Sequence, residues 1–249
     1  MLKKLLLFIV LISLLGCSNP NYNGDIPIVS VDSREFIREW VLCGPFPNPL
    51  AEGVGDYLHD ETTLGFYIDY LESAGGETGI LPLPGLKIQG EDNQTRRWFR
   101  HTSTEDLVDF TTQFDKKLGV VCYAACYLES DKAQRIMLGL GSNDGIRAWL
   151  NGKMIWDNHQ ARGAAKDNDW LWADVKEGKN LLLLKIDQGL GSWGLYARVV
   201  DPEEKIKAAK EIVSLELLVE KRLSQNSVEI NVGRSSRIMI LDKKPTYTT

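Results

Sequence analysis

The fold is decided by one hairpin sequence, Ile146-Arg147-Ala148-Trp149-Leu150-Asn151-Gly152-Lys153-Met154-Ile155-Trp156. Two runs rich in β-branched and aromatic residues flank the central Asn-Gly pair, and such runs favour strands. Asn-Gly tolerates the two positive φ angles of a type I′ turn, whose twist matches that of antiparallel strands. The sequence therefore predicts a β-hairpin over residues 145–157.

Short apolar runs of the same kind precede and follow this hairpin, with turn residues between them. Their spacing is typical of an antiparallel sandwich or jelly roll. The run from Leu181 to Ile186, apolar except for Lys185, indicates a strand that is buried on both faces. The expected strands cover residues 106–111, 118–128, 134–141, 145–151, 152–157, 170–176, 180–187 and 193–200.

Two helices are expected beside the strands. Residues 64–73 form a plausible short helix that ends at Gly75-Gly76. Asp201-Pro202-Glu203-Glu204 has a capping Asp and a Pro at the first helical position, so a second helix is expected over residues 202–223. The expected class is all-β: a sandwich over 34–200, followed at 201–249 by this helix and a short hairpin-like tail.

The N-terminus has the pattern of a secretory signal. Lys3 and Lys4 precede an apolar run from Leu5 to Leu15. About 11 helical residues rise about 16 Å, roughly half of a bilayer core, so the run is too short to span a membrane. We expect residues 1–16 to be a signal peptide. Asn, Pro and Gly are frequent in the polar stretch that follows, so residues 17–33 are expected to be a flexible tether.

The tetrapeptide Leu14-Leu15-Gly16-Cys17 resembles the lipobox of bacterial lipoproteins. The resemblance implies cleavage before Cys17 and attachment of several acyl chains to it, and stable anchoring requires more than one chain. Ser18 follows the cysteine, where an aspartate often marks retention at the inner membrane. The expected location is the cell envelope, with a lipid-anchored protein and a preference for the outer membrane.

Composition excludes several classes of function. The formal net charge is −5, so the chain has no basic excess for a nucleic-acid partner. Cys43, Cys122 and Cys126 are expected to be small buried hydrophobes, and the three histidines are too far apart in sequence to indicate zinc. No nucleophile elbow, zinc-binding helix motif, P-loop or dinucleotide fingerprint is present. We therefore expect no enzyme, although 34 acidic residues leave a glycosidase open.

Two stretches of the sequence resemble a known family. They are Trp40-Val41-Leu42-Cys43-Gly44-Pro45-Phe46-Pro47 and Leu140-Gly141-Ser142-Asn143-Asp144-Gly145-Ile146-Arg147-Ala148-Trp149-Leu150-Asn151-Gly152-Lys153. Gly191-Ser192-Trp193-Gly194-Leu195 adds to the likeness. Together they resemble the galactose-binding-like jelly-roll modules of bacterial secreted glycosidases, lyases and lipoproteins. The resemblance covers residues 34–200 and implies a sandwich that binds carbohydrate or packs on a neighbouring domain, and that is rarely catalytic.

The turn Ser142-Asn143-Asp144-Gly145 also resembles the protective-antigen-type sugar-binding domain. In that family two adjacent aspartates bind calcium, and the calcium holds sugar hydroxyls. Asn143 stands at the first position here, and an amide oxygen can still ligate calcium. A calcium site at Asn143 and Asp144 is thus one expectation. The alternative is a turn in which both side chains bond to nearby backbone amides.

The candidate ligand site is placed where loops gather at one end of the sandwich. Trp193 is expected to stack on a sugar ring, Arg162 to donate to hydroxyls, and Asp144 with Asn143 to accept or to bind calcium. For Arg162 the alternative is a salt bridge to Asp144 or Asp187.

Another pair of tryptophans has two interpretations. Trp170 and Trp172 lie two residues apart, so they share one sheet face, which is either a platform or the core.

The sequence thus predicts a membrane-anchored lipoprotein with a non-catalytic sandwich that binds glycans. A structural or assembly lipoprotein that contacts a protein partner in the envelope is the first alternative. A glycosidase fragment is the second.

Overall fold

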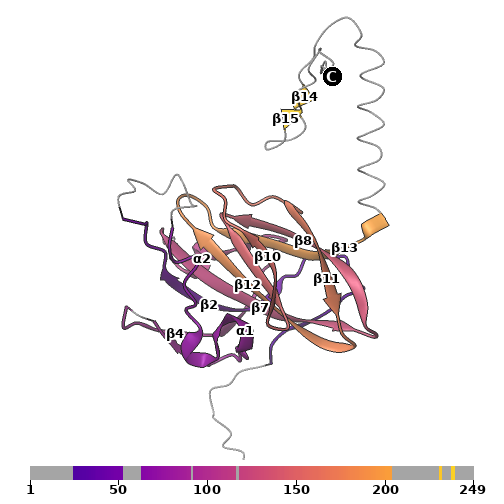
Figure 1. Cartoon of the computed structure of the whole chain (residues 1–249), viewed down its shortest axis with the longest axis horizontal. Coiled ribbons are helices and arrows are strands. Elements are labelled where there is room, and N and C mark those ends of the chain that lie inside the picture. The colour runs from indigo at the N-terminus through magenta and orange to yellow at the C-terminus, as the bar shows by residue number, and fades with distance from the viewer. Residues whose placement is uncertain are drawn as a thin grey trace, which may run out of the picture.

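The computed structural model describes residues 25–52, 63–90, 92–115 and 118–203, and the backbone of 230–231 and 237–238. Two β-sheets pack face to face, and apolar side chains from both sheets fill the space between them (Figure 1). The prediction of an all-β antiparallel sandwich is confirmed. The expected signal peptide, Cys17 and the expected helix beyond Glu203 lie outside the described residues.

The sheets differ in size. The larger one contains, in spatial order, β10 (Lys153–Asn158), β9 (Ile146–Leu150), β12 (Gly178–Gln188), β7 (Val120–Ser130), β2 (Glu39–Pro47) and β5 (Phe99–Thr102), and β1 (Ile28–Ser30) pairs in parallel with β7. The smaller one contains β11 (Asp169–Val175), β8 (Gln134–Asn143), β13 (Gly194–Val200) and β6 (Val108–Asp109). The larger sheet of the sandwich is therefore built around β12 and β7.

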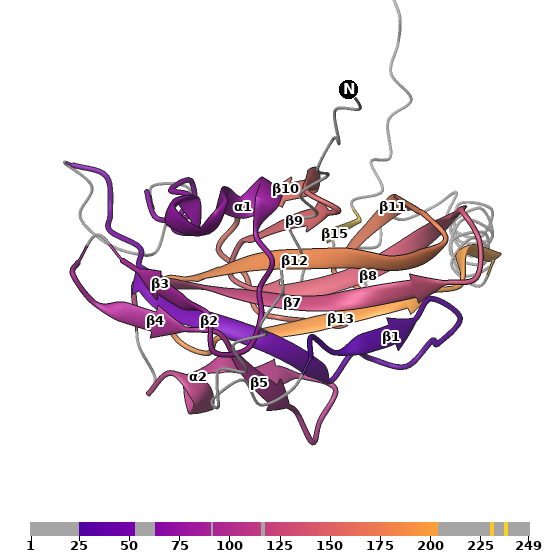
Figure 2. The same ribbon diagram turned by 90° about the horizontal axis from the view of Figure 1, so that it is seen from below.

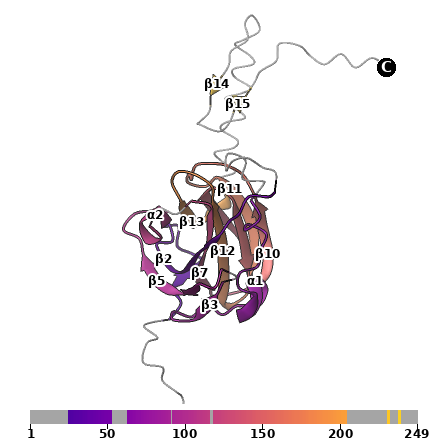
Figure 3. The same ribbon diagram turned by 90° about the vertical axis from the view of Figure 1, so that its left-hand side faces the viewer.

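Short elements complete the described chain. They are the 3-10 helix η2 (Glu72–Ala74), α1 (Gly76–Gly79), α2 (Phe110–Gln113), the ribbon of β3 (Lys87–Gln89) and β4 (Thr95–Arg97), and the pair β14 (Ile230–Asn231) and β15 (Arg237–Ile238). In Figure 3, α1 and β10 lie on one flank of the sandwich, and α2 and β5 lie on the opposite flank.

The larger sheet is covered on both faces. Figure 2 shows α1 on one side of β12 and β7, and β13 on the other. Leu182 and Leu184 face the core between the sheets, whereas Leu183 belongs to a second apolar cluster on the outer face. Residues from the 68–98 segment close that second cluster. The prediction that this strand is buried on both faces is confirmed for residues 182–186.

The hairpin that decided the fold is present. β9 and β10 pair antiparallel, and Lys153 lies opposite Leu150. Asn151 has φ 51° and Gly152 has φ 78°, the two positive values that a type I′ turn requires. The amide N–H of Leu181 donates to Asn151 Oδ1 at 3.0 Å, so the turn is also attached to β12.

The helix expected at residues 64–73 is wrong. Residues 64–71 form turns, and helical hydrogen bonding is confined to the short η2 and α1 around Gly75. Phe66, Tyr70 and Leu71 are buried and pack down onto the sandwich. Tertiary packing of these side chains therefore overrides the local helical pattern.

The tether expected at residues 17–33 is partly wrong. Ile28–Ser30 form β1, which pairs with β7 opposite residues 127–129. Ile26 and Val31 are buried on either side of this strand. The fold therefore includes residues 25–33.

Candidate functional site

The loops that were expected to converge at one end of the sandwich do so. The amide N–H of Arg162 donates to Asp144 Oδ1 at 3.1 Å, and Gly189 N–H donates to Asp144 Oδ2 at 2.9 Å. Asn143 Nδ2 donates to Ser192 Oγ at 3.1 Å. The expected site residues Asn143, Asp144 and Arg162 thus lie together, and backbone groups of two loops hold the Asp144 carboxylate.

Arg162 faces inward. Its guanidinium forms an ion pair with Asp169, with Nη2 to Oδ2 at 2.5 Å, and also donates to Ser142 Oγ at 2.7 Å. Its Nε donates to the backbone oxygen of Asp144 at 3.3 Å. The side chain therefore stabilises the loop that precedes β11. Its ion-pair partner is Asp169, whereas the alternative considered from the sequence was Asp144 or Asp187.

The residues at this end do not fit a calcium ion. Calcium takes six to eight oxygen ligands, mostly carboxylates and carbonyls. Asn143 Oδ1 is buried without a hydrogen-bond partner, but the Asp144 carboxylate already accepts two N–H groups. Arg162 places a positive charge beside it. Within the described part of the chain, no group of three or more His, Cys, Asp or Glu side chains is arranged to hold a metal.

The expected stacking role of Trp193 is wrong. Its side chain is 1% exposed, and its ring lies in the core 5.3 Å from that of Phe110 and 5.4 Å from that of Phe114. Trp193 precedes β13 directly, where it fills the space beside α2. Its face is therefore not available to a ligand.

Trp170 and Trp172, in contrast to Trp193, are exposed to solvent. β11 alternates strictly between buried and exposed residues, and both indoles fall on the exposed face, at 45% and 48% exposure. Leu171 and Ala173 point into the core between them. Of the two interpretations, the structure selects the solvent-facing one. The spacing of two residues was the only signal in the sequence, and it could not say which face is outside.

A strip of side chains along β11 therefore forms a surface platform, which we define as Trp170, Trp172 and Asp174 with Arg135 beside them. Asp174 is paired in register with Arg135 of β8, and Arg135 Nε donates to Asp174 Oδ1 at 2.8 Å. This hydrogen bond to Arg135 lowers the pKa of Asp174 below its usual value, so the carboxylate is charged. Two aromatic side chains of β11 thus lie in line with a charged pair that joins β11 to β8.

The loop over 163–168 borders this platform on the β8 side. Gly139 and Gly141 of β8 face the same side as Trp170, and Gly139 is its register partner. A Cβ on Gly141 would overlap the backbone oxygen of Ala165, and a Cβ on Gly139 would overlap the Asp167 carboxylate. The loop over 163–168 therefore lies directly on these glycines and limits the platform to the width of β11 beside Trp170.

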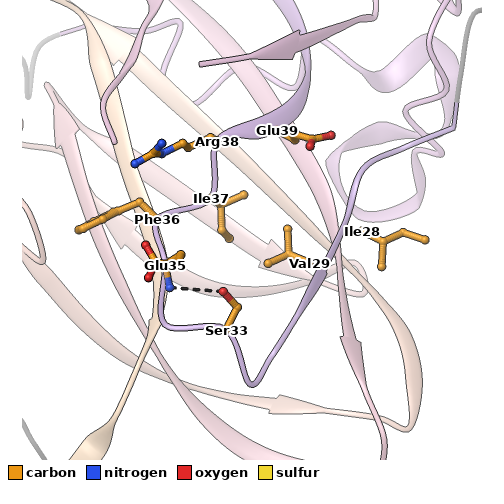
Figure 4. A pocket seen from close by; sticks show the side chains of 8 residues that line it. All are labelled: Ile28, Val29, Ser33, Glu35, Phe36, Ile37, Arg38 and Glu39. Carbon is orange, nitrogen blue, oxygen red and sulfur yellow. Dashed lines mark hydrogen bonds between the residues drawn. The ribbon is translucent and has the colours of Figure 1, made fainter. Parts of the chain in front are cut away.

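A shallow pocket of about 310 Å³ lies elsewhere, between β1 and the chain that leads into β2 (Figure 4). Val29 and Ile37 form its apolar centre. Arg38 at its rim forms an ion pair with Asp106 at 2.6 Å. Another rim residue, Glu39, accepts from Arg100 at 2.9 Å. These rim charges are thus paired with groups outside the pocket.

A buried charged cluster lies under α1. Lys185 is 0% exposed, and its Nζ donates to the Ile68 backbone oxygen at 2.5 Å and to Glu77 Oε1 at 3.1 Å. The Tyr123 hydroxyl donates to the same Glu77 oxygen at 2.7 Å. Burial lowers the pKa of Lys185 to about 8 and raises that of Glu77. The cluster connects the outer layer to β12 and β7.

A second buried polar cluster fixes residues 63–67. His159 Nε2 lies 3.1 Å from Asp187 Oδ2 and 2.9 Å from Thr63 Oγ1. The imidazole stacks on Phe66 at a centroid distance of 4.0 Å, and its Nδ1 lies 3.2 Å from the Tyr67 hydroxyl. Asp187 and Thr63 are fully buried, so this arrangement anchors the loop to the end of β12.

No protein-family model matches the chain, and no curated protein sequence is significantly similar to it. Several solved structures are weakly similar. The β-glucosidase of Kluyveromyces marxianus in complex with glucose has a TM-score of 0.36 and 17% identity, over 52% of this chain and 17% of that enzyme. The GH31 α-xylosidase of Xanthomonas citri has a TM-score of 0.32 and 10% identity, over 69% and 16% of the two chains.

The PA14 sugar-binding domain from an RTX adhesin has a TM-score of 0.29 and 11% identity, over 66% of this chain and 91% of that domain. The chain thus spans about a sixth of the two glycosidases. By their descriptions these three are two glycosidases and a sugar-binding domain, and all three TM-scores lie below 0.5. Within the described residues, no helix is long and apolar enough to cross a membrane.

Proposed function

We propose that this protein is a lipid-anchored component of the bacterial cell envelope whose sandwich binds glycans without catalysis, through Trp170 and Trp172. The observation that carries the proposal is the exposure of these two indoles on one face of β11. Large aromatic side chains are usually buried in the core, as Trp193 is. Two neighbouring indoles with nearly half of their surface exposed therefore indicate a surface that binds a ligand.

The chemistry of the platform suits a sugar. A pyranose ring has C–H groups on its faces, and these stack on the electron-rich face of an indole. Its hydroxyl groups both donate and accept, so they match a carboxylate beside a guanidinium. Asp174 and Arg135 supply that pair on the same face. Affinity is expected to be modest, with Kd in the millimolar to micromolar range, about −4 to −8 kcal/mol.

The anchoring half of the proposal rests on the sequence of residues 1–17. A positively charged start, a short apolar run and the lipobox-like Leu14-Leu15-Gly16-Cys17 support processing at Cys17. The seven residues 18–24 span at most about 25 Å when fully extended. The sandwich would then stay close to the membrane surface, in the outer membrane if Ser18 directs sorting.

The test is a glycan-array screen of the soluble mature chain, followed by calorimetry with the best ligand. Trp170→Ala and Trp172→Ala should each weaken binding about tenfold, which is about 1.4 kcal/mol. Trp172→Tyr should retain much of the affinity, because a flat aromatic face remains. Leu81→Ala is the matched control, since Leu81 is also a half-exposed apolar residue but lies on a distant loop.

Binding that survives both tryptophan changes in folded variants would contradict the proposed site. If no glycan binds, the glycan-binding function itself is wrong, and the exposed indoles would instead favour an envelope protein as partner, because Trp is enriched at the centre of protein interfaces.

A further inference from the structure

We propose that the platform binds a single, extended and uncharged polysaccharide chain that runs parallel to β11. This inference rests on the proposed glycan-binding function and adds the class of ligand. It is carried by the arrangement of side chains along β11 and by the loop over 163–168 beside it.

The direction of the ligand follows from the strand. Trp170, Trp172 and Asp174 are alternate residues, so they face the same side at intervals of roughly 6.7 Å, and the row from first to last is roughly 13 Å long. Two stacking faces and one charged group in a line can contact consecutive units of an extended chain. A compact monosaccharide would use only part of this row.

The width of the platform limits the ligand to one chain. On the β8 side, the loop over 163–168 occupies the space above Gly139 and Gly141. The loop is held there by the ion pair between Asp167 and Arg198, with Nη2 to Oδ2 at 2.5 Å. On the other side β11 is the edge of its sheet. Beside Trp170 the strip is therefore one strand wide, which suits an unbranched chain better than a branched or crystalline surface.

The charges beside the platform favour an uncharged ligand. Arg135 is paired with Asp174, Arg198 with Asp167, and Lys166 with Asp106. Each of these three cations is thus matched by an aspartate, and Lys153 adds one further positive charge that acts on Asp174. A uronate or sulfate group would have to compete with that aspartate, whereas a hydroxyl group can bridge the carboxylate and the guanidinium together.

The experiment is calorimetry of the mature chain against linear gluco- and xylo-oligosaccharides of two to six units, with alginate and heparin as anionic probes at low and high salt. Affinity should rise about tenfold from the disaccharide to the longer oligosaccharides, as more of the row is covered. Arg135→Gln should lower affinity for the longer oligosaccharides about fivefold while leaving disaccharide binding nearly unchanged. Arg100→Gln is the matched control, because it breaks the comparably exposed Arg100–Glu39 pair in the larger sheet.

The outcomes separate the two proposals. Loss of affinity in Trp172→Ala, together with length-dependent binding and insensitivity to salt, supports the inference. Tryptophan-dependent binding that is equal for all lengths, or that favours alginate or heparin and is lost at high salt, would overturn the inference and leave the glycan-binding function standing. Binding to no oligosaccharide and no polymer would remove both.

Discussion

The ammonium group of Lys185 is buried between β12 and α1, where it pairs with Glu77. Burial is the largest effect on its pKa, which falls to about 8, and the contact with Glu77 acts in the opposite direction. Arg147 lowers the pKa further, and Asp69 raises it. In the unfolded chain the amine regains its ordinary value near 10.5. The native state therefore holds fewer protons than the unfolded state between these two pH values.

The contribution of Lys185 to stability should consequently rise with pH from about 8 towards 10.5, because the unfolded chain binds the extra proton in that window. The full difference is on the order of 3 kcal/mol. Cys43, Cys122 and Cys126 act in the opposite direction, because burial raises the pKa of their thiols and the unfolded chain loses these protons first. Urea denaturation at pH 7.5, 8.5 and 9.5 measures how stability changes with pH, and this slope should be lower in Lys185→Met than in the wild type and unchanged in Lys179→Met, a control on the same strand. An unchanged slope in Lys185→Met would contradict the assignment. The series stops at pH 9.5, because burial raises the pKa of Tyr123 and its contribution has the opposite sign above pH 10.

At the same scale, the sequence allowed only part of the site to be predicted. Periodicity showed that Trp170 and Trp172 share a face, because side chains alternate along any strand. It could not show which face is solvated, since that depends on the larger sheet, which packs against the inner face of β11. Trp193 was misplaced for a related reason: it lies just outside β13, where alternation gives no direction.

Among the elements, the hairpin of β9 and β10 offers the sharpest test. Gly152 has φ 78°, and an added Cβ would overlap the backbone oxygen of Thr78 in α1. Gly178 has φ 84°, but an added Cβ would meet nothing within 4 Å. Gly178→Ala should therefore cost only backbone strain, about 1 kcal/mol, whereas Gly152→Ala should cost about 2–3 kcal/mol. Thermal melts of the two variants measure the difference, and equal melting temperatures would show that the contact with α1 does not matter.

Strands were predictable and the short helix was not, for a physical reason. The eight expected strands correspond to β6–β13, because alternating or continuous apolar runs and turn residues such as Asn151-Gly152 act locally. Residues 64–73 have apolar side chains at helical intervals as well, yet Phe66 and Leu71 are buried from a chain of turns. Long-range packing against the larger sheet determines the conformation of that segment, and such packing cannot be inferred from local sequence patterns.

For the molecule as a whole, the proposed acylation of Cys17 would decide where the sandwich is held. Cys17→Ala should abolish acylation and release the protein from the membrane fraction, because a single residue carries all the acyl chains. Metabolic labelling with palmitate and fractionation of cells measure both effects. Ser18→Ala is the control, since it leaves the cysteine intact. Palmitate incorporation that persists in Cys17→Ala would show that the lipobox-like sequence is not used.

The double covering of the larger sheet has a consequence for amide hydrogen exchange. Side chains shield β7 and β12 on both faces, and neighbouring strands flank them on both edges, so their amides can meet solvent only when most of the molecule opens. β11 has one solvent-exposed face and is the edge strand of its sheet, so it can open without the rest of the molecule. Deuterium should therefore enter β11 long before β7 and β12, and the protection of these two central strands should report the global free energy of unfolding.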